Sequence, residues 1–382
     1  MVRCGIDRIG EYPHLFEGKR LAMVTSVSGV TLDGKPGYVV FHERYPLRFL
    51  FSPEHGLQAQ CGNGEDVTEP DRDASTGLPV ISLYGGQQGK HIPPRVMEQL
   101  DGIVYDIQDL GTRFYTFIST MLLVMEDCAR AGKELIILDR PAVLGGRIVE
   151  GGLLDPAYRS FIGPYSLCTR YGLTAGELAK MVNEETGLGC RLDVLPCEGW
   201  TRGQMFPDTG NTWVKPSTAI ADFETALLYP GMCIFEGTSL SEGRGTARPF
   251  GIIGAPFLDG QQLSREMNAL GLPGVAFSPA RFCPTASKFK GQVCSGVELK
   301  ITSFREFRTV RTGVTLLYRI LEQCPGKVTL PSCAWSDHPL ISFLTGSGIF
   351  EGEIPPLSVL LETWEQDSAA FSQRKQAYHI YD

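Results

Sequence analysis

The chain has 382 residues, of which 43% are apolar and 20% charged, with 44 glycines and 25 prolines. This composition is typical of a folded globular protein and excludes a disordered, collagen-like or coiled-coil chain. The net charge is −8, and lysines and arginines are spread along the chain, which argues against a nucleic-acid partner. Apolar runs stay far below the roughly 20 residues that a membrane-spanning helix needs. We therefore expect a small molecule or a neutral polymer as ligand, and no membrane partner.

The cysteines and the first residues bear on the cellular compartment. There are 11 cysteines, an odd number without any C-x-x-C pair, which favours reduced buried thiols over a disulfide framework. Charged residues run through positions 1–20, where a secretory signal would have its apolar core. Both features predict a cytoplasmic protein.

Short β-branched or aromatic runs alternate with helical patterns through the first 140 residues, which is typical of βαβ units. Between the fourth and fifth of these runs, apolar residues from Phe114 to Ala131 recur at helical spacing, and Gly132 is a suitable stop. The predicted fold class is α/β, with a Rossmann-like, doubly wound, mainly parallel sheet. The predicted strands cover residues 20–26, 48–52, 80–84, 103–107 and 134–139.

A further unit follows this sheet. Thr174 and Glu177 form a capping box that opens a helix, and residues 191–195 form the next strand. Residues 199–216 are rich in Gly, Pro, Asp, Asn and Thr, so we place the domain boundary there, with domains 1–212 and 213–382. The second domain is expected to be smaller and of the α+β class. Its predicted helices cover residues 261–270, 304–323 and 361–378, the last of which is either a homodimer contact or packed on its own domain, and its predicted strands cover 275–278 and 297–302.

Several nucleotide and metal motifs are absent or misspaced. Residues 85–90 are similar to a phosphate-binding loop but are one residue short and lack the Ser or Thr that binds magnesium. No G-x-G-x-x-G opens the first βα turn, and there is no G-x-S-x-G elbow. The six histidines form no H-E-x-x-H motif. We therefore expect no cofactor and no metal.

Polar side chains stand at the carboxyl ends of the predicted strands, where open α/β sheets bind ligands. Carboxylates for acid–base chemistry, aromatic faces for sugar rings and arginine for an anion together favour a carbohydrate site. The alternative is that these residues cap helices and turns. They are Glu54 and His55 after the second strand, Tyr84 after the third, Asp106, Asp109, Arg113 and Tyr115 after the fourth, and Asp139 and Arg140 after the fifth.

Three carboxylates are the candidates for catalysis. The residues on either side of Glu54 fix a tight turn, and a carboxyl at the mouth of an apolar sheet is suited to act as a general acid. Asp106 and Asp109 are three positions apart, so one of them can serve as base or orienting partner; capping of the following helix is the alternative. Arg113 is a candidate clamp for a substrate carboxylate, or else it pairs with Asp109.

A second polar segment lies in the glycine-rich residues 235–246. It carries Glu236, Glu242 and Arg244, and its glycines allow close backbone approach to a ligand, with N–H groups free to bind an anion. The alternative is a plain connection with a Glu–Arg ion pair. Charged loops at a domain interface are often functional, so we expect these three residues to bind substrate.

A set of motifs runs in order through nearly the whole chain. The most specific are YDIQDLGTRFY at 105–115 and SEGRGT at 241–246, and PEHG at 53–56, DRP at 139–141 and YGLTAGEL at 171–178 add to them. With these motifs the chain resembles the bacterial exo-β-N-acetylmuramidases of the NamZ family. The resemblance implies a Rossmann-like N-terminal domain, a smaller C-terminal domain and an active cleft between them.

The resemblance also implies an activity, the release of terminal N-acetylmuramic acid from the non-reducing end of peptidoglycan fragments, with Glu54 as the leading catalytic carboxyl. The lactyl carboxylate of muramic acid calls for a cation, for which Arg113 and Arg244 are the candidates. The acetamido group of the substrate can act as internal nucleophile, oriented by Asp106 or Asp109. Where the family has Asn-Pro after its DRP motif, this chain has Ala-Val at 142–143. A muropeptide-binding protein without catalysis is the alternative function.

Overall fold

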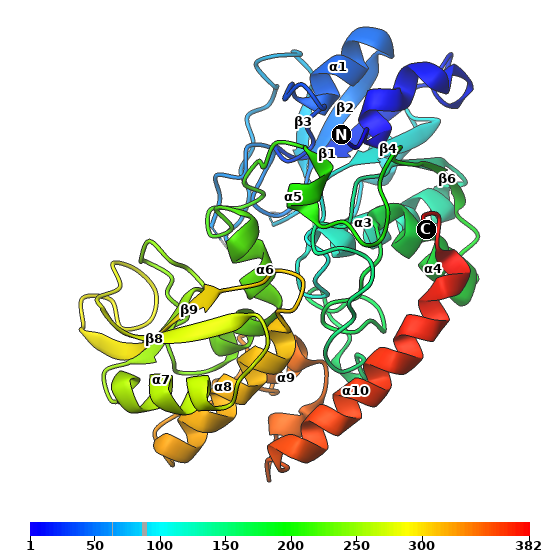
Figure 1. Cartoon of the computed structure of the whole chain (residues 1–382). Helices are drawn as coiled ribbons and strands as arrows, with labels where there is room; N and C mark the ends of the chain where they lie inside the picture. The colour runs from blue at the N-terminus through cyan, green and yellow to red at the C-terminus, as the bar shows by residue number, and fades with distance from the viewer. Residues whose placement is uncertain (63, 86–89) are drawn as a thin grey trace.

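The computed structural model describes residues 1–62, 64–85 and 90–382 (Figure 1). Most of the misspaced phosphate-loop segment at 85–90 therefore lies outside the described residues. Within the described part, the chain builds one six-stranded sheet and one three-stranded sheet. No helix of this part combines the length and the apolar character needed to cross a bilayer.

The six-stranded sheet is parallel throughout, and its strand order is β3-β2-β1-β4-β5-β6. This is the Rossmann order, with the reversal between β1 and β4, so the predicted α/β class is confirmed. The strands are β1 (Leu21–Thr25), β2 (Leu47–Ser52), β3 (Val80–Ser82), β4 (Gly102–Asp106), β5 (Glu134–Leu138) and β6 (Arg191–Leu195), and the helices are α1 (Gly37–Arg44), α2 (Pro94–Met97), α3 (Phe117–Ala131), α4 (Ala175–Thr186) and α5 (Phe206–Thr209).

Successive side chains of each strand point to opposite faces of this sheet, and both faces are buried. Met23 and Val104 pack on one face in a core with Phe41 of α1. Ile103 and Leu135 pack on the other face, in a larger core that includes side chains of α3 and α4.

The second half holds an antiparallel sheet in the order β7-β9-β8 and a layer of helices beside it (Figure 1). Helices α6 and α8 cross closely because Gly231 and Gly313 face each other, where a Cβ on either residue would overlap the opposite backbone. The elements are α6 (Phe223–Met232), a 3-10 helix (Cys233–Gly237), β7 (Ile252–Ala255), α7 (Gly260–Ala269), β8 (Val275–Phe282), β9 (Cys294–Ile301), α8 (Thr309–Gln323), α9 (Leu340–Thr345) and α10 (Leu357–Arg374).

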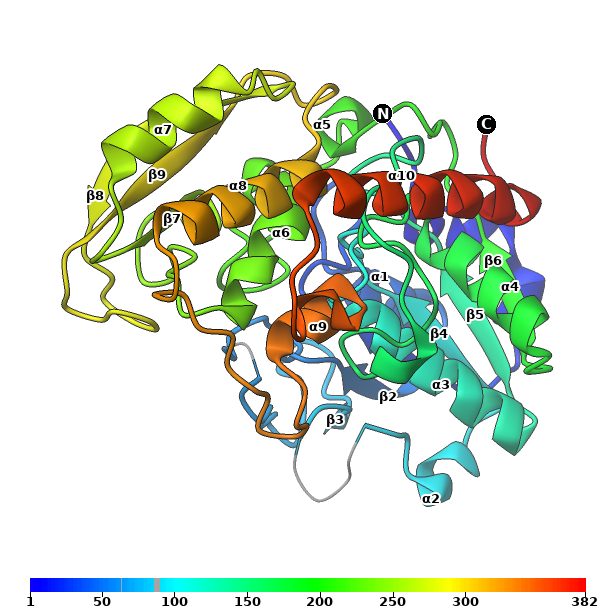
Figure 2. The ribbon, with the colours of Figure 1, turned by 90° about the horizontal axis from the view of Figure 1, so that it is seen from below.

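Helix α10 returns to the first half of the chain, as Figure 2 shows. Its Arg374 forms an ion pair with Glu185 of α4. Trp364, Phe371 and Tyr378 are all buried against the same chain. The predicted helix at 361–378 therefore packs on its own chain through these aromatic side chains, and it contacts the first of the two predicted domains instead of staying on the second.

The structure differs from the predictions mainly at element ends. Helix α3 begins at Phe117 instead of residue 114, because the preceding residues form a turn closed by the Tyr115 amide and the Thr112 carbonyl. Helix α8 begins at Thr309 instead of residue 304, because the Arg308 guanidinium binds the carbonyls of residues 305 and 306. Helix α6 is not among the predicted helices, and it contains Pro230, a residue that disfavours a helix interior. The domain boundary at residue 212 stays a prediction; it lies between α5 and α6.

Candidate active site

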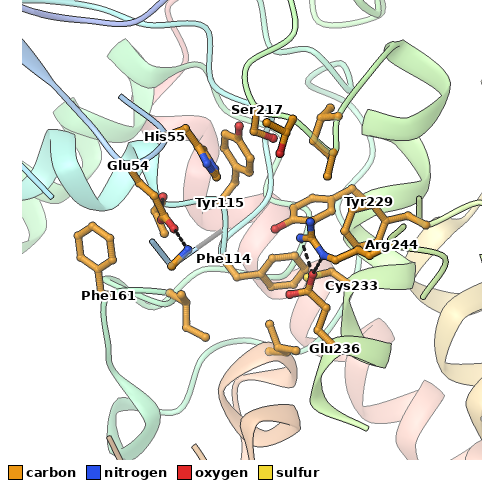
Figure 3. A pocket seen from close by; sticks show the side chains of 18 of the residues that line it. Glu54, His55, Phe114, Tyr115, Phe161, Ser217, Tyr229, Cys233, Glu236 and Arg244 are labelled. Carbon is orange, nitrogen blue, oxygen red and sulfur yellow. Dashed lines mark hydrogen bonds and ion pairs between the residues drawn. The ribbon is translucent and has the colours of Figure 1, made fainter. Parts of the chain in front are cut away.

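A cavity of about 250 Å³ opens between the loops that follow β2, β3 and β4 and the segment from α6 to β7. Figure 3 shows Glu54 and His55 on one side of it and Glu236 and Arg244 on the other. Six of the predicted site residues line this cavity: Glu54, His55, Tyr84, Tyr115, Glu236 and Arg244.

Glu54 is held in one orientation by two hydrogen bonds. Its Oε1 accepts from the Gly64 amide at 2.8 Å, and its Oε2 accepts from the Thr116 hydroxyl at 2.6 Å. The turn that directs it follows β2, where His55 and Gly56 both take left-handed backbone conformations, with φ of 72° and 82°. For a histidine this conformation is strained, and such strain is concentrated at functional sites. Glu54 is only 3% exposed, so its carboxylate is buried, oriented and at the cavity wall.

The neighbouring tyrosine side chains present neutral hydroxyl groups. Burial, together with the charge of Glu54, raises the pKa of Tyr84 to about 12. Burial also raises the pKa of the Tyr115 hydroxyl, which has no hydrogen-bond partner among the described residues. The His55 Nδ1 lies 3.1 Å from the Cys61 carbonyl, so Nδ1 carries the proton in this arrangement. The two phenols are therefore available as hydrogen-bond donors to a ligand.

The opposite wall carries an ion pair. Arg244 donates to Oε1 of Glu236 through Nε at 2.7 Å and contacts it through Nη2 at 2.6 Å. Its guanidinium also lies 5.0 Å from the ring centre of Phe250. Burial raises the pKa of Glu236, while the Arg244 charge opposes that rise. This wall therefore carries a planar cation that is paired with a carboxylate, and its remaining N–H groups are the donors for an anionic substituent.

Glu242 lies behind this wall and does not line the cavity. It is buried, and its Oε2 accepts from Lys288 Nζ at 2.9 Å. The same ammonium binds the backbone carbonyls of Phe235 and Leu240. Glu242 thus fixes the loop that presents Glu236 and Arg244, which is a positioning role.

Asp106 and Arg140 pair with each other away from the cavity. Arg140 Nε donates to Asp106 Oδ1 at 2.7 Å, and both side chains are buried. They lie where the strand order reverses, the place at which a Rossmann sheet binds a dinucleotide. The cavity beside Arg140 measures about 20 Å³, close to the space of one water molecule. A Cβ on Gly37 would come within 2.5 Å of Asp106, so this crevice is filled by protein.

The remaining three predicted residues hold loops together. Asp109 accepts hydrogen bonds from the Gly111 amide and the Tyr171 hydroxyl, and burial raises its pKa to about 6. Arg113 is fully buried and donates to backbone carbonyls. Asp139 accepts from the Gly176 amide at the start of α4 and from the hydroxyls of Thr174 and Tyr381, and burial raises its pKa to about 6. None of the three lines the cavity.

Several aromatic side chains that line the cavity are not among the predicted site residues. Phe114 lies within the motif at 105–115, which is the signal that could have identified it, and Tyr229 lies in α6. Phe161, Phe250 and Trp335 come from loops without a periodic pattern. Their side chains make much of the wall apolar, as expected for a sugar site. Within the described ranges, no group of three or more His, Cys, Asp or Glu side chains is placed to hold a metal ion.

Comparison with known proteins gives consistent matches over the whole chain. Residues 21–224 match the family model of the N-terminal part of the exo-beta-N-acetylmuramidase NamZ, and residues 227–381 match that of its C-terminal part. The chain is 36% identical over 386 residues to the peptidoglycan beta-N-acetylmuramidase NamZ of Bacillus subtilis strain 168, covering 100% of this chain and 91% of the relative.

Two solved structures from Bacteroides fragilis share the fold. Both are DUF1343 family proteins. One is 31% identical with a TM-score of 0.90, and the alignment covers 100% of this chain and 99% of that chain. The other is 24% identical with a TM-score of 0.77 and the same coverage, and it bears on the fold alone.

Proposed function

The chain belongs to the exo-β-N-acetylmuramidase NamZ family, and we propose that it is a glycoside hydrolase that releases terminal N-acetylmuramic acid from peptidoglycan fragments. The observation that carries this proposal is the Glu54 carboxylate, buried and held by two hydrogen bonds at the wall of a cavity of about 250 Å³. That cavity suits one monosaccharide, and removal of a single terminal unit is what an exo-acting enzyme does.

Hydrolysis of a glycosidic bond needs a proton donor for the leaving oxygen and a group that attacks or activates water on the other side of the ring. Glu54 and Glu236 are the carboxylates that line the described part of the cavity, and they come from opposite walls. We assign Glu54 as the catalytic carboxyl. The second group is then either Glu236 or the acetamido group of the substrate. Asp106 and Asp109 act through the loop after β4, as positioning residues.

Recognition of muramic acid depends on its lactyl carboxylate, which N-acetylglucosamine lacks. Of the two arginines expected to bind it, Arg244 lines the cavity and Arg113 does not. The bidentate geometry of a guanidinium suits a carboxylate, and desolvation in a buried wall strengthens the contact. Arg244 is therefore the residue that selects the muramic acid unit, and Tyr84, Tyr115 and His55 bind the sugar hydroxyls.

We place this reaction in the cytoplasm, within cell-wall recycling. All eleven cysteines are free thiols, and eight of them are buried, as expected in a reducing compartment. Titration of the denatured protein with a thiol reagent, after purification from the native host without reductant, should find all of them reduced. Protein recovered with paired cysteines would instead indicate an oxidising compartment.

The first experiment is a time course with 4-nitrophenyl N-acetylmuramide, and the matching N-acetylglucosaminide as control substrate. Wild type should release nitrophenol from the muramide alone, and Glu54→Gln should lose at least about a thousandfold in kcat while it still binds N-acetylmuramic acid. Glu65→Gln is the matched control, because Glu65 lies exposed on the same loop and should keep full activity.

The alternative function is a muropeptide-binding protein without turnover. In that case folded wild type and Glu54→Gln would bind muropeptides equally in calorimetry, and neither would release nitrophenol. A muramide turnover that Glu54→Gln leaves unchanged would contradict the assignment of Glu54 and keep the hydrolase.

A further inference from the structure

Trp335 borders the cavity and is unusually exposed for its size. Its side chain lines the cavity wall, and the residue is 58% exposed. The tryptophans Trp200 and Trp364, by contrast, are 4% and 6% exposed. An exposed aromatic ring is common on protein surfaces, but this one also lines the proposed sugar site, so a ligand in the cavity can cover it.

The indole is held firmly from behind. Its ring centre lies 4.3 Å from that of Phe343 in α9. The loop that carries it is closed by the bridge between Ser332 and Pro339 and by a hydrogen bond from the Cys333 amide to the His338 carbonyl. Phe343 in turn packs against Tyr158. One side of the indole is therefore fixed by packing, while much of its surface is exposed. The side chain would lose little further conformational entropy when a ligand binds to it.

The size of the cavity determines which part of the substrate can contact the exposed indole of Trp335. A volume of about 250 Å³ suits one saccharide unit, so the rest of a glycan must leave through the entrance. A pyranose ring has one face of C–H groups. Stacking this face on an aromatic ring removes apolar surface of both groups from water, which favours binding. We infer that Trp335 is the stacking platform for the saccharide on the leaving-group side of the cleaved bond. This inference rests on the proposed function and adds a second sugar to the substrate.

The platform is tested by comparing two substrates, the disaccharide N-acetylmuramyl-β-1,4-N-acetylglucosamine and methyl β-N-acetylmuramide, which has no second ring. Trp335→Ala should lose about five- to tenfold in kcat/KM on the disaccharide, mainly through KM, and less than about twofold on the methyl glycoside. Trp335→Phe should retain most of the preference, because it keeps an aromatic face. Phe304→Ala is the control, since Phe304 is exposed but does not line the cavity.

Equal losses on both substrates, or no loss on either, would overturn the inference. Fluorescence gives a second readout that needs no turnover. Titration of Glu54→Gln with the disaccharide should shift the tryptophan emission to shorter wavelength, and Glu54→Gln/Trp335→Phe should lack the shift. If wild type cleaves neither substrate, the proposed hydrolase fails, and this titration alone decides the platform: a shift that depends on Trp335 supports it and its absence overturns it.

Discussion

The Thr116 hydroxyl donates a hydrogen bond of 2.6 Å to Oε2 of Glu54. The two residues are 62 positions apart and follow different strands, β4 and β2, which the parallel sheet places next to β1 on either side. The segments after β2 and β4 therefore bring Glu54 and Thr116 together at the carboxyl edge of the sheet. Thr116 immediately precedes α3, whose first turn is anchored in the core, so the donor is fixed by the helix.

Replacing Thr116 by valine removes this donor with little change in shape. We expect kcat for the muramide to fall about tenfold with KM nearly unchanged, because Glu54 loses its orientation and not its contact with the ligand. Thr116→Ser should restore most of kcat. Thr120→Val is the control, since the Thr120 hydroxyl, one turn further along α3, has no partner among the described residues. Equal kcat for wild type and Thr116→Val would contradict the positioning role.

Arg244 should determine the preference for a carboxylate in the ligand. We compare binding of N-acetylmuramic acid with that of its lactyl amide, which has the same shape and no charge. Wild type should prefer the acid by about tenfold or more, and Arg244→Gln should bind the two alike. Arg248→Gln is the control, because Arg248 lies on the same loop but pairs with Glu224 outside the cavity. If Arg244→Gln kept the full preference for the acid, a residue other than Arg244 would bind the lactyl carboxylate.

Arg113 should matter for stability and not for this preference. Its guanidinium binds the carbonyls of Gly152, Leu167 and Leu344, which join both halves of the chain. Arg113→Met leaves these buried acceptors without a donor, so the free energy of unfolding should fall by about 3 to 5 kcal/mol in urea denaturation. Arg130→Met, on the exposed side of α3, should change it by less than about 1 kcal/mol. A selective loss of acid binding in Arg113→Met would contradict this assignment.

Short apolar runs that alternate with helical patterns predict the parallel sheet, because a strand buried on both faces has apolar residues at nearly every position. The same reasoning brought polar residues to the strand ends, but it could not tell which side chains reach the cavity. Asp106 ends β4 and points into a crevice closed by Gly37 and Arg140, whereas Glu54 follows a turn with two left-handed residues. Whether a side chain at a strand end reaches the cavity depends on how loops from distant segments pack, and the periodicity of the sequence does not report that packing.

The second wall of the site shows the same limit. Arg244 was recognisable from charge in a glycine-rich segment, whereas Trp335 comes from a loop about 90 residues further along the chain. No spacing in the sequence connects that loop with β2. The loop that carries Trp335 reaches the cavity because α9 holds it there and because the second half of the chain packs on the first. These contacts exist only in the folded chain.

Lys375 gives a prediction about stability and pH. It follows α10, is buried, and its Nζ donates to the carbonyls of Gly146 and Gly172. Burial, helped by the nearby charge of Arg202, lowers its pKa from 10.5 to about 7. Between these two values the unfolded chain binds a proton that the folded chain does not, so this residue makes the protein more stable as pH rises from 7 toward 10.

Lys375→Met should abolish this contribution. The difference in the free energy of unfolding between wild type and Lys375→Met should shift by about 2 kcal/mol in favour of wild type between pH 7 and pH 9. Comparing the two proteins at each pH removes the titration of the buried cysteines, which is common to both. Lys180→Met, which removes an exposed lysine of α4, should show no such shift against wild type. Parallel pH profiles for wild type and Lys375→Met would mean that Lys375 stays protonated in the folded chain, held by its two carbonyls.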